Sequence, residues 1–336
     1  MNATILPVAP GGPHPLLRAL ASTRLTLVAL AAIAAGVAAN AQVEGGMPRL
    51  LAAVFALGAA NLLAALVAQP RLRADLPLFV FHIALLAILV LAAAGRLTAL
   101  TGTMELANGE VFEGQLLTRE AGPLHPDRLQ RLRFVNDGFT IDYAEGWRRG
   151  RTVNQVRVFG RGGEVTRLAI GDIDALVLDG YRFYTTPNKG FAPVFRWVPR
   201  DGEAMQRGAV HLPAYPMHEH AQEQSWRLPG TARDAWVMLE LDRPAIDPTR
   251  ESSFRVPGSY RLVTVIDSVR RELAAGESVA LAEGVLVFEG LTTWMGYKVY
   301  YDPTLPWMLA ASLLAVASLA AFCWRRFGRA AAGKGA

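Results

Sequence analysis

The sequence of 336 residues contains one cysteine, Cys323. A single thiol excludes a disulfide within the chain and excludes the CxxC pattern of thiol exchange. The sequence also lacks a glycine-rich phosphate loop, a nucleophile elbow and a convincing pair of carboxylates. Nothing in it therefore predicts an enzymatic site that this chain would carry by itself.

Charged residues are scarce in residues 1–95 and 305–336. With 52% hydrophobic residues and a mean hydropathy of +0.23, the chain is too apolar for an ordinary soluble protein. Residues 96–304 have an ordinary globular composition and are long enough to bury a core of their own. The net charge of +5 comes from arginines beside the apolar runs, so a basic nucleic-acid-binding surface is not expected.

Four apolar runs are long enough to cross a lipid bilayer as helices. We expect three at residues 25–41, 50–68 and 77–95 and a fourth at 305–324, with tails at 1–22 and 325–336. The first tail is rich in proline and glycine, which predicts a loosely held segment. Residues 39–41 also fit a signal-peptide cleavage pattern, but the long preceding region and the apolar run that follows argue against cleavage.

Arginines predict the orientation, because cytosolic loops of membrane proteins are enriched in Arg and Lys. Basic residues cluster before the first run, between the second and third runs, and after the fourth. We therefore expect both termini in the cytosol and residues 96–304 outside it. The clusters consist of Arg18 and Arg24, of Arg71 and Arg73, and of Arg325, Arg326 and Arg329.

Residues 96–304 predict a β-rich domain, either a sandwich or barrel-like, because apolar and polar residues alternate between Gly, Pro, Asn and Asp turns. Residues 136–138 (Asn-Asp-Gly) predict the turn of a hairpin that joins 129–134 to 139–143. Residues 199–232 are polar and contain proline, which predicts a long excursion from the sheet. The other expected strands are 153–160, 164–170, 174–186, 235–242, 259–269 and 284–293.

His82 is the one histidine inside an expected span, about 9 Å along its helix from the cytosolic end. An ionisable side chain at membrane depth is costly and marks a functional site by default. His82 is either a packing residue that donates a hydrogen bond to a neighbouring helix, or a metal or haem ligand or proton relay. For Asn61, in the second run, we expect the packing role, with a hydrogen bond to another helix.

A second group of histidines lies in the polar excursion, at His218 and His220 with Glu219 between them and His211 nearby. Alternate histidines share one face of a strand, but a zinc site needs a third and usually a fourth ligand held rigidly. We expect a solvated loop here and no metal site.

The order of segments resembles the ResB family of the System II cytochrome c biogenesis machinery. The matching segments are STRLTL (22–27), NLL (61–63), FHIALL (81–86), NGEVF (108–112), DGYRFYTTP (179–187) and GYKVYYDPTLPWMLAASLLAVASL (296–319). The resemblance covers residues 20–327 approximately. No single segment is diagnostic, and the chain departs from the pattern in its compact outer domain and in the DPTLP at 302–306.

The resemblance implies that the chain handles haem b in a bacterial inner membrane, with residues 96–304 in the periplasm. It implies a multi-span CcsA/ResC-type partner, apocytochrome c as client, and His82 as an axial haem ligand, with no other metal-binding residue. It also implies that the chain is not an enzyme and that any haem-lyase chemistry belongs to the partner. The alternative is a membrane-anchored sensor or assembly scaffold that binds a protein without haem and has no need of His82.

Overall fold

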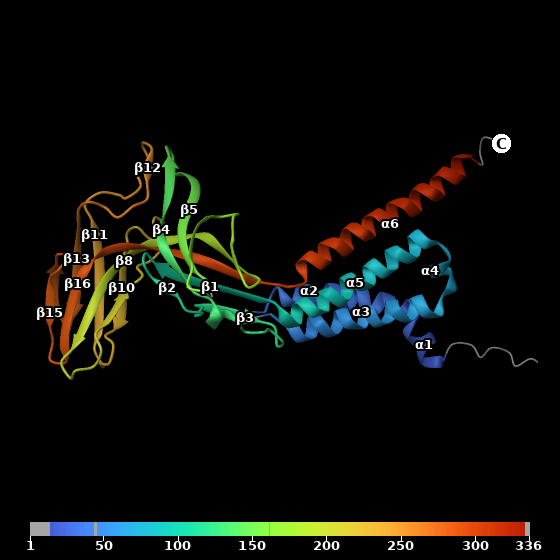
Figure 1. Cartoon of the computed structure of the whole chain (residues 1–336), viewed down its shortest axis with the longest axis horizontal. Coiled ribbons are helices and arrows are strands. Elements are labelled where there is room, and N and C mark those ends of the chain that lie inside the picture. Colours follow the sequence, from blue (N-terminus) through green and yellow to red (C-terminus); the bar gives the residue numbers. More distant parts are fainter. Residues whose placement is uncertain (1–13, 44–45, 161, 333–336) are drawn as a thin grey trace, which may run out of the picture. The chain divides into compact units, whose positions relative to one another are not determined.

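The computed structural model describes residues 14–43, 46–160 and 162–332 (Figure 1). It divides the chain into two compact units. A helical unit comprises residues 1–100, 120–126 and 302–336, and a β unit comprises residues 101–119 and 127–301. The expected boundary near residue 96 is close to this division, but residues 120–126 belong with the helices. Residues 1–13 of the expected loose tail lie outside the described residues.

Four helices of the described chain are long and apolar enough to cross a membrane, three before the β unit and one after it, as expected. The first tail differs from the expectation, because residues 15–20 form a short helix. The helices are α1 (Pro15–Leu20), α2 (Thr23–Asn40), α3 (Pro48–Ala68), α4 (Pro70–Ala74), α5 (Leu76–Thr98) and α6 (Leu305–Ala332).

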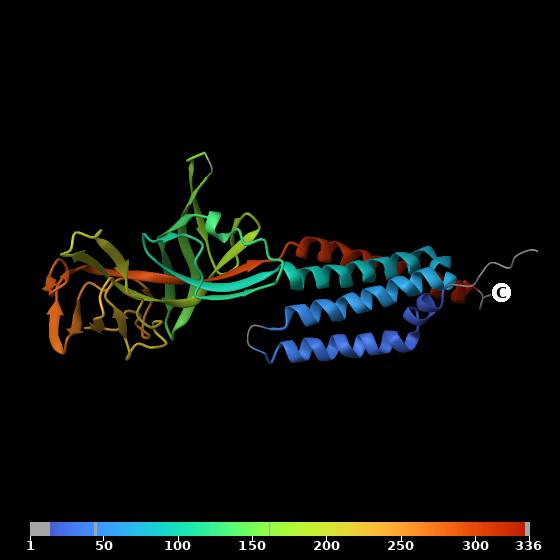
Figure 2. The ribbon, with the colours of Figure 1, turned by 90° about the horizontal axis from the view of Figure 1, so that it is seen from below.

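The long helices lie side by side within the helical unit, in the order α2, α3, α5, α6 (Figure 2). Proline occupies the first turn of α3 and α5, where its missing N–H costs no hydrogen bond. Asp75 caps α5 by accepting a hydrogen bond from the backbone N–H of Leu78. Each helix satisfies its own backbone, which is the condition for crossing a bilayer.

The structure confirms the packing role that was expected for Asn61 of α3. Its side-chain amide donates to the carbonyl of Leu20 (2.6 Å), and its oxygen accepts from the Thr26 hydroxyl of α2 (2.8 Å). The side chain is 3% exposed. A buried amide is costly in an apolar environment unless it is hydrogen-bonded, so this contact ties α3 to α2 and to the turn before it.

The β unit contains three sheets built from sixteen described strands. The first sheet has the order β3-β1-β16-β8-β7, with β15 paired to β16 and β9 to β8; the second has the order β12-β4-β5-β6, with β2 paired to β4; the third has the order β10-β11-β13-β14. The strands are β1 (Leu100–Ala107), β2 (Val111–Phe112), β3 (Thr118–Ala121), β4 (Phe134–Ala144), β5 (Arg148–Phe159), β6 (Val165–Ile170), β7 (Leu176–Leu178), β8 (Tyr181–Pro199), β9 (Gln206–Ala209), β10 (Glu223–Arg227), β11 (Asp234–Leu241), β12 (Ser252–Ser253), β13 (Tyr260–Ile266), β14 (Val269–Leu273), β15 (Ser278–Ala280) and β16 (Gly284–Tyr301).

The prediction of a hairpin turn at residues 136–138 is wrong. Strand β4 runs through these residues, which form a bulge against β5, and the turn follows at residues 145–147. The Asn136 side chain explains the difference, because it accepts from the Gly138 N–H (3.0 Å) and donates to the carbonyl of Leu106 (2.9 Å). The Asn-Asp-Gly pattern, which commonly forms a turn, here forms a bulge within a strand. Residues 129–131 form a short 3₁₀ helix in place of the expected first strand.

Four other expectations need correction. The segment 174–186 is divided between β7 and β8 by a tight turn at Asp179 and Gly180, and 259–269 is divided between β13 and β14 by a turn at Asp267 and Ser268. The strand expected at 284–293 continues to residue 301. The polar segment 199–232 contains the short strands β9 and β10.

The long strands β8 and β16 form an antiparallel ribbon that runs the length of the β unit (Figure 1). The register shifts where residues 186–188 of β8 face Gly296 of β16. A Cβ at Gly296 would lie 2.9 Å from both the Asn188 carbonyl oxygen and the Thr186 hydroxyl. Thr186 also donates to the Gly296 carbonyl (3.0 Å), which fixes the bulge. The close approach of the two backbones therefore requires glycine at this position.

We predict that Gly296→Ala lowers the stability of the β unit by about 1–3 kcal/mol, because a methyl group there forces the two strands apart. Thermal unfolding of the purified protein, followed by circular dichroism in the β region, measures the effect. Gly258→Ala is the matched control, since a Cβ at Gly258 meets no atom within 4 Å. Equal unfolding temperatures for the two variants would contradict the assignment.

Candidate functional site

His82 lies on α5, one turn after Leu78. Its Nδ1 is 2.7 Å from the Leu78 carbonyl oxygen, so Nδ1 carries the proton and donates it to that oxygen. The ring of Phe81 meets the imidazole edge-on at 5.4 Å between centroids. Among the described residues no donor is paired with Nε2 of His82. The geometry therefore fixes one tautomer and presents the Nε2 lone pair.

The surroundings of His82 are apolar. Leu89, two turns further on the same face of α5, packs beside Gly58 of α3. The imidazole is half-buried in the helical unit. A partly exposed imidazole in an apolar helix is unfavourable in lipid unless something covers it.

The arrangement of His82 is the one expected of a histidine that binds a metal ion. Metal-binding histidines characteristically donate their other ring N–H to a carbonyl or carboxylate, which orients the ring and raises its basicity. The Leu78 carbonyl supplies this contact. The packing role considered for His82 would require a hydrogen bond to another helix, and its hydrogen bond stays within α5.

Histidines of the β unit are placed differently. His220 has a side chain that is 93% exposed, and His218 and Glu219 lie with it in a stretch of turns, away from any regular strand. The described residues contain no group of three His, Cys, Asp or Glu side chains arranged to hold a metal ion.

His211 lies apart from these histidines, between two glutamates. Its Nδ1 is 3.1 Å from Glu105, its Nε2 is 3.7 Å from Glu110, and its ring stacks on Trp294 at 5.4 Å. Burial would lower the pKa of His211, but the two carboxylates raise it to about 9. At neutral pH it is therefore a cation that links the β1 region to β16 and has no lone pair for a metal.

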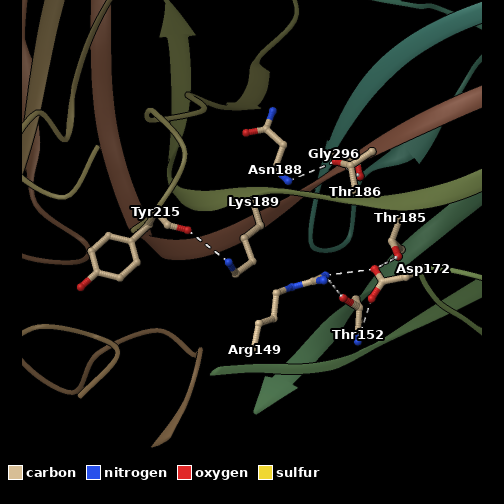
Figure 3. Close-up of polar contacts among 9 residues, drawn as sticks. All are labelled: Arg149, Thr152, Asp172, Thr185, Thr186, Asn188, Lys189, Tyr215 and Gly296. Atoms are coloured by element: carbon tan, nitrogen blue, oxygen red, sulfur yellow. Dashed lines mark hydrogen bonds and ion pairs between the residues drawn. The ribbon is translucent and has the colours of Figure 1, made fainter. Parts of the chain in front are cut away.

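Lys189 of β8 is buried in the β unit at 2% exposure. Its ammonium donates to the Tyr215 carbonyl (3.2 Å; Figure 3). It also lies 5.4 Å and 5.1 Å from the ring centres of Tyr143 and Phe254. No carboxylate of the described residues lies within ion-pair distance of it. Burial, with a smaller contribution from Arg149, lowers the pKa of Lys189 to about 8.

Arg149 of β5, a charged neighbour of Lys189, takes part in a network of hydrogen bonds. It donates to Asp172 (3.0 Å) and to the Thr152 hydroxyl, and Asp172 also accepts from Thr185 (3.1 Å; Figure 3). Burial alone would raise the pKa of Asp172, but these hydrogen bonds and the arginine charge lower it. The sequence signalled neither this network nor Lys189, because the bulge at 186–188 decides which β8 side chains face inward.

Two cavities of about 550 and 510 Å³ flank β12. The first is lined by Arg148 and Arg149 and by Asp142 and Glu251, so opposite charges balance in it. The first cavity therefore selects no ligand by charge.

Comparison with known proteins gives little further information. No protein-family model matches the chain, and no curated protein is significantly similar to it. Among solved structures, a chain titled "Cytochrome c Heme Lyase CcmF" is similar at a TM-score of 0.28 and 15% sequence identity. The similarity covers 89% of this chain and 34% of that chain, so this chain spans about a third of the other's length. A TM-score of this size does not establish that the two folds correspond.

We predict that Lys189→Met stabilises the β unit by about 2 kcal/mol at pH 7, because burial of a charged ammonium is costly. The pKa of Lys189 is lower in the folded state than in the unfolded state. The wild type therefore regains stability as the pH rises from about 8 to 10.5, where the folded protein holds fewer protons than the unfolded one.

Denaturant unfolding between pH 7 and pH 10.5 tests this prediction, and the difference between variant and wild type should shrink with rising pH. The matched control is Lys298→Met, because Lys298 also lies over a tyrosine ring but is exposed. A gap that is constant with pH would show that Lys189 does not change its charge in this range.

Proposed function

We propose that the chain is a haem-handling subunit of a cytochrome c maturation complex in a bacterial inner membrane. The observation that carries the proposal is the imidazole of His82, held in one tautomer by the Leu78 carbonyl on an apolar helix. The resemblance of residues 20–327 to the ResB family supports it, because that family is considered to bind haem at the corresponding histidine.

The role of the chain in this proposal is binding and positioning. Haem b, when bound, supplies an iron that accepts an axial nitrogen and that later becomes part of the cytochrome. The Leu78 carbonyl would hold Nδ1–H of His82 and leave Nε2 to bind the iron, on a helix whose other residues at this depth are apolar. A CcsA/ResC-type partner supplies the second axial histidine and any lyase chemistry, and apocytochrome c is the client.

The membrane orientation belongs to the same proposal. The arginine clusters in α1 and at the start of α2, between α3 and α5, and at the end of α6 favour cytosolic termini. The β unit is then periplasmic, and His82 lies in the cytosolic half of the bilayer, where haem made in the cytosol enters.

We predict that a reporter active only outside the cytosol works when it is inserted at Asn188 and fails when it is fused after Lys334. The positive charges in α1 and at the start of α2, between α3 and α5, and at the end of α6 hold those segments on the cytosolic side. The opposite pattern would overturn the orientation and the placement of His82 in the inner half of the membrane.

We predict that His82→Gln removes or changes the haem spectrum of the chain copurified with its partner, because glutamine retains a donor for the Leu78 carbonyl but does not bind iron. Membrane protein levels should stay near wild type, since α5 remains apolar. His82→Gly should regain part of a low-spin spectrum when imidazole is added, because imidazole fills the space left by the ring.

The matched control is His220→Gln, in which an exposed histidine of the β unit is changed. An absorption spectrum of each purified complex, together with the amount of mature cytochrome c, measures the outcome. Full haem loading and full cytochrome maturation in His82→Gln would refute the ligand role and favour the scaffold alternative.

A further inference from the structure

The second of the two cavities beside β12, of about 510 Å³, is lined by residues of the segment 243–259. Its volume lies in the range of protein sites for small molecules. Three arginines and two carboxylates line it, which leaves one positive charge in excess. These charged residues are Arg243, Arg250 and Arg255, with Asp247 and Glu251.

One arginine of this cavity is paired within the fold. Arg250 donates through Nε to one oxygen of Asp247 (2.7 Å). The other oxygen of Asp247 accepts from the backbone N–H (2.9 Å) and the hydroxyl (2.7 Å) of Thr249. Both oxygens of Asp247 are thus used, and its charge is balanced by that of Arg250.

The other two arginines of the cavity are not paired. Within the described residues, no hydrogen bond, ion pair or ring contact holds the side chain of Arg243 or Arg255. The first cavity differs, because there Arg148 donates to a carbonyl and Arg149 donates to a carboxylate. Two guanidinium groups on one cavity therefore have their donors left for a ligand, and the planar guanidinium matches the geometry of a carboxylate.

The backbone that carries Arg243 and Arg255 is held by contacts with the rest of the β unit. The N–H of Ala245 donates to the Tyr215 hydroxyl (2.9 Å), and the N–H of Phe254 donates to a carbonyl of β4 (2.9 Å). Phe254 is also buried, at 2% exposure. Because the backbone is fixed near both arginines, binding a ligand requires the ordering of their side chains alone, which lowers the entropic cost.

Ser252 and Glu251 have opposite effects on an anion in this cavity. The Ser252 oxygen accepts from the backbone N–H of Asp247 (3.2 Å), so the hydroxyl hydrogen is left to donate to a ligand. Glu251 has no partner among the described residues and repels an anion. One free carboxylate against two free guanidinium groups still favours a negatively charged ligand.

We propose that this cavity is a binding site for a ligand with two carboxylates, one for each of the guanidinium groups of Arg243 and Arg255. The carboxylates belong either to a free dicarboxylic acid or to the two propionates of a haem. The site does not depend on the proposed haem-handling function, because a free dicarboxylic acid contains no iron.

Isothermal titration of the purified full-length chain in detergent with glutarate tests the proposal. Arg243→Gln and Arg255→Gln should each weaken binding by about tenfold, because each removes a charge-assisted hydrogen-bonded pair. The double variant should abolish binding. Glu251→Gln should strengthen binding, because it removes a like charge from the cavity. All three side chains are exposed, so these variants retain the fold.

The matched control is Arg167→Gln, which removes the same charge from an exposed position of β6. It should bind glutarate like the wild type, and the neutral analogue glutaramide should bind to none of the variants. Absence of glutarate binding in the wild type would overturn the site, and so would equal affinities of the wild type and the Arg243/Arg255 double variant.

Competition with hemin and with hemin dimethyl ester separates the two sources of carboxylates. Displacement of glutarate by hemin but not by the ester assigns the site to haem propionates, and displacement by neither assigns it to a free dicarboxylic acid. Displacement by both would show that the cavity does not recognise carboxylates. His82→Gln should bind glutarate as tightly as the wild type, so failure of the His82 site and failure of this cavity are distinguishable.

Discussion

The hydrocarbon interior of a membrane offers no hydrogen-bond partners, and this constraint shapes the helical unit. Asn61 satisfies its amide with Thr26 and with backbone carbonyls around Leu20. Within the described residues, His82 has a hydrogen-bond partner for one nitrogen, the Leu78 carbonyl of its own helix. The two side chains therefore differ in how many of their polar atoms are hydrogen-bonded. A packing residue such as Asn61 uses its polar atoms within the fold, whereas the binding role proposed for His82 requires one nitrogen that is left for a ligand.

In the β unit, too, buried polar side chains find hydrogen-bond partners within the fold. Asn136, Asn154 and Tyr297 are buried and hydrogen-bonded to one another, beside a cluster of phenylalanines. Lys189 is a buried charge without an ion pair among the described residues, since aromatic rings and a carbonyl surround its ammonium. Such a group costs stability, and nothing in the β unit assigns it a ligand.

The sequence predicts elements whose signal is local and long, such as the four apolar helices and strands β5, β6 and β11. Prediction from the sequence fails where a contact from elsewhere in the fold changes the structure that a local pattern usually forms. Asn136 is an example, because its side chain bonds to the Leu106 carbonyl of another strand and turns an apparent hairpin loop into a bulge. The depth of His82 follows from its neighbours in sequence, but the fixed tautomer of His82 follows only from helix geometry.

The central claim is that Nε2 of His82 binds haem iron. Pulsed electron paramagnetic resonance on the ferric haem complex measures this bond directly when only this chain is labelled with ¹⁵N-histidine and the partner is not. The account predicts a ¹⁵N coupling of an axial imidazole that disappears in His82→Gln and persists in His220→Gln. A spectrum with ¹⁴N couplings alone, or a ¹⁵N coupling that survives in His82→Gln, would contradict it.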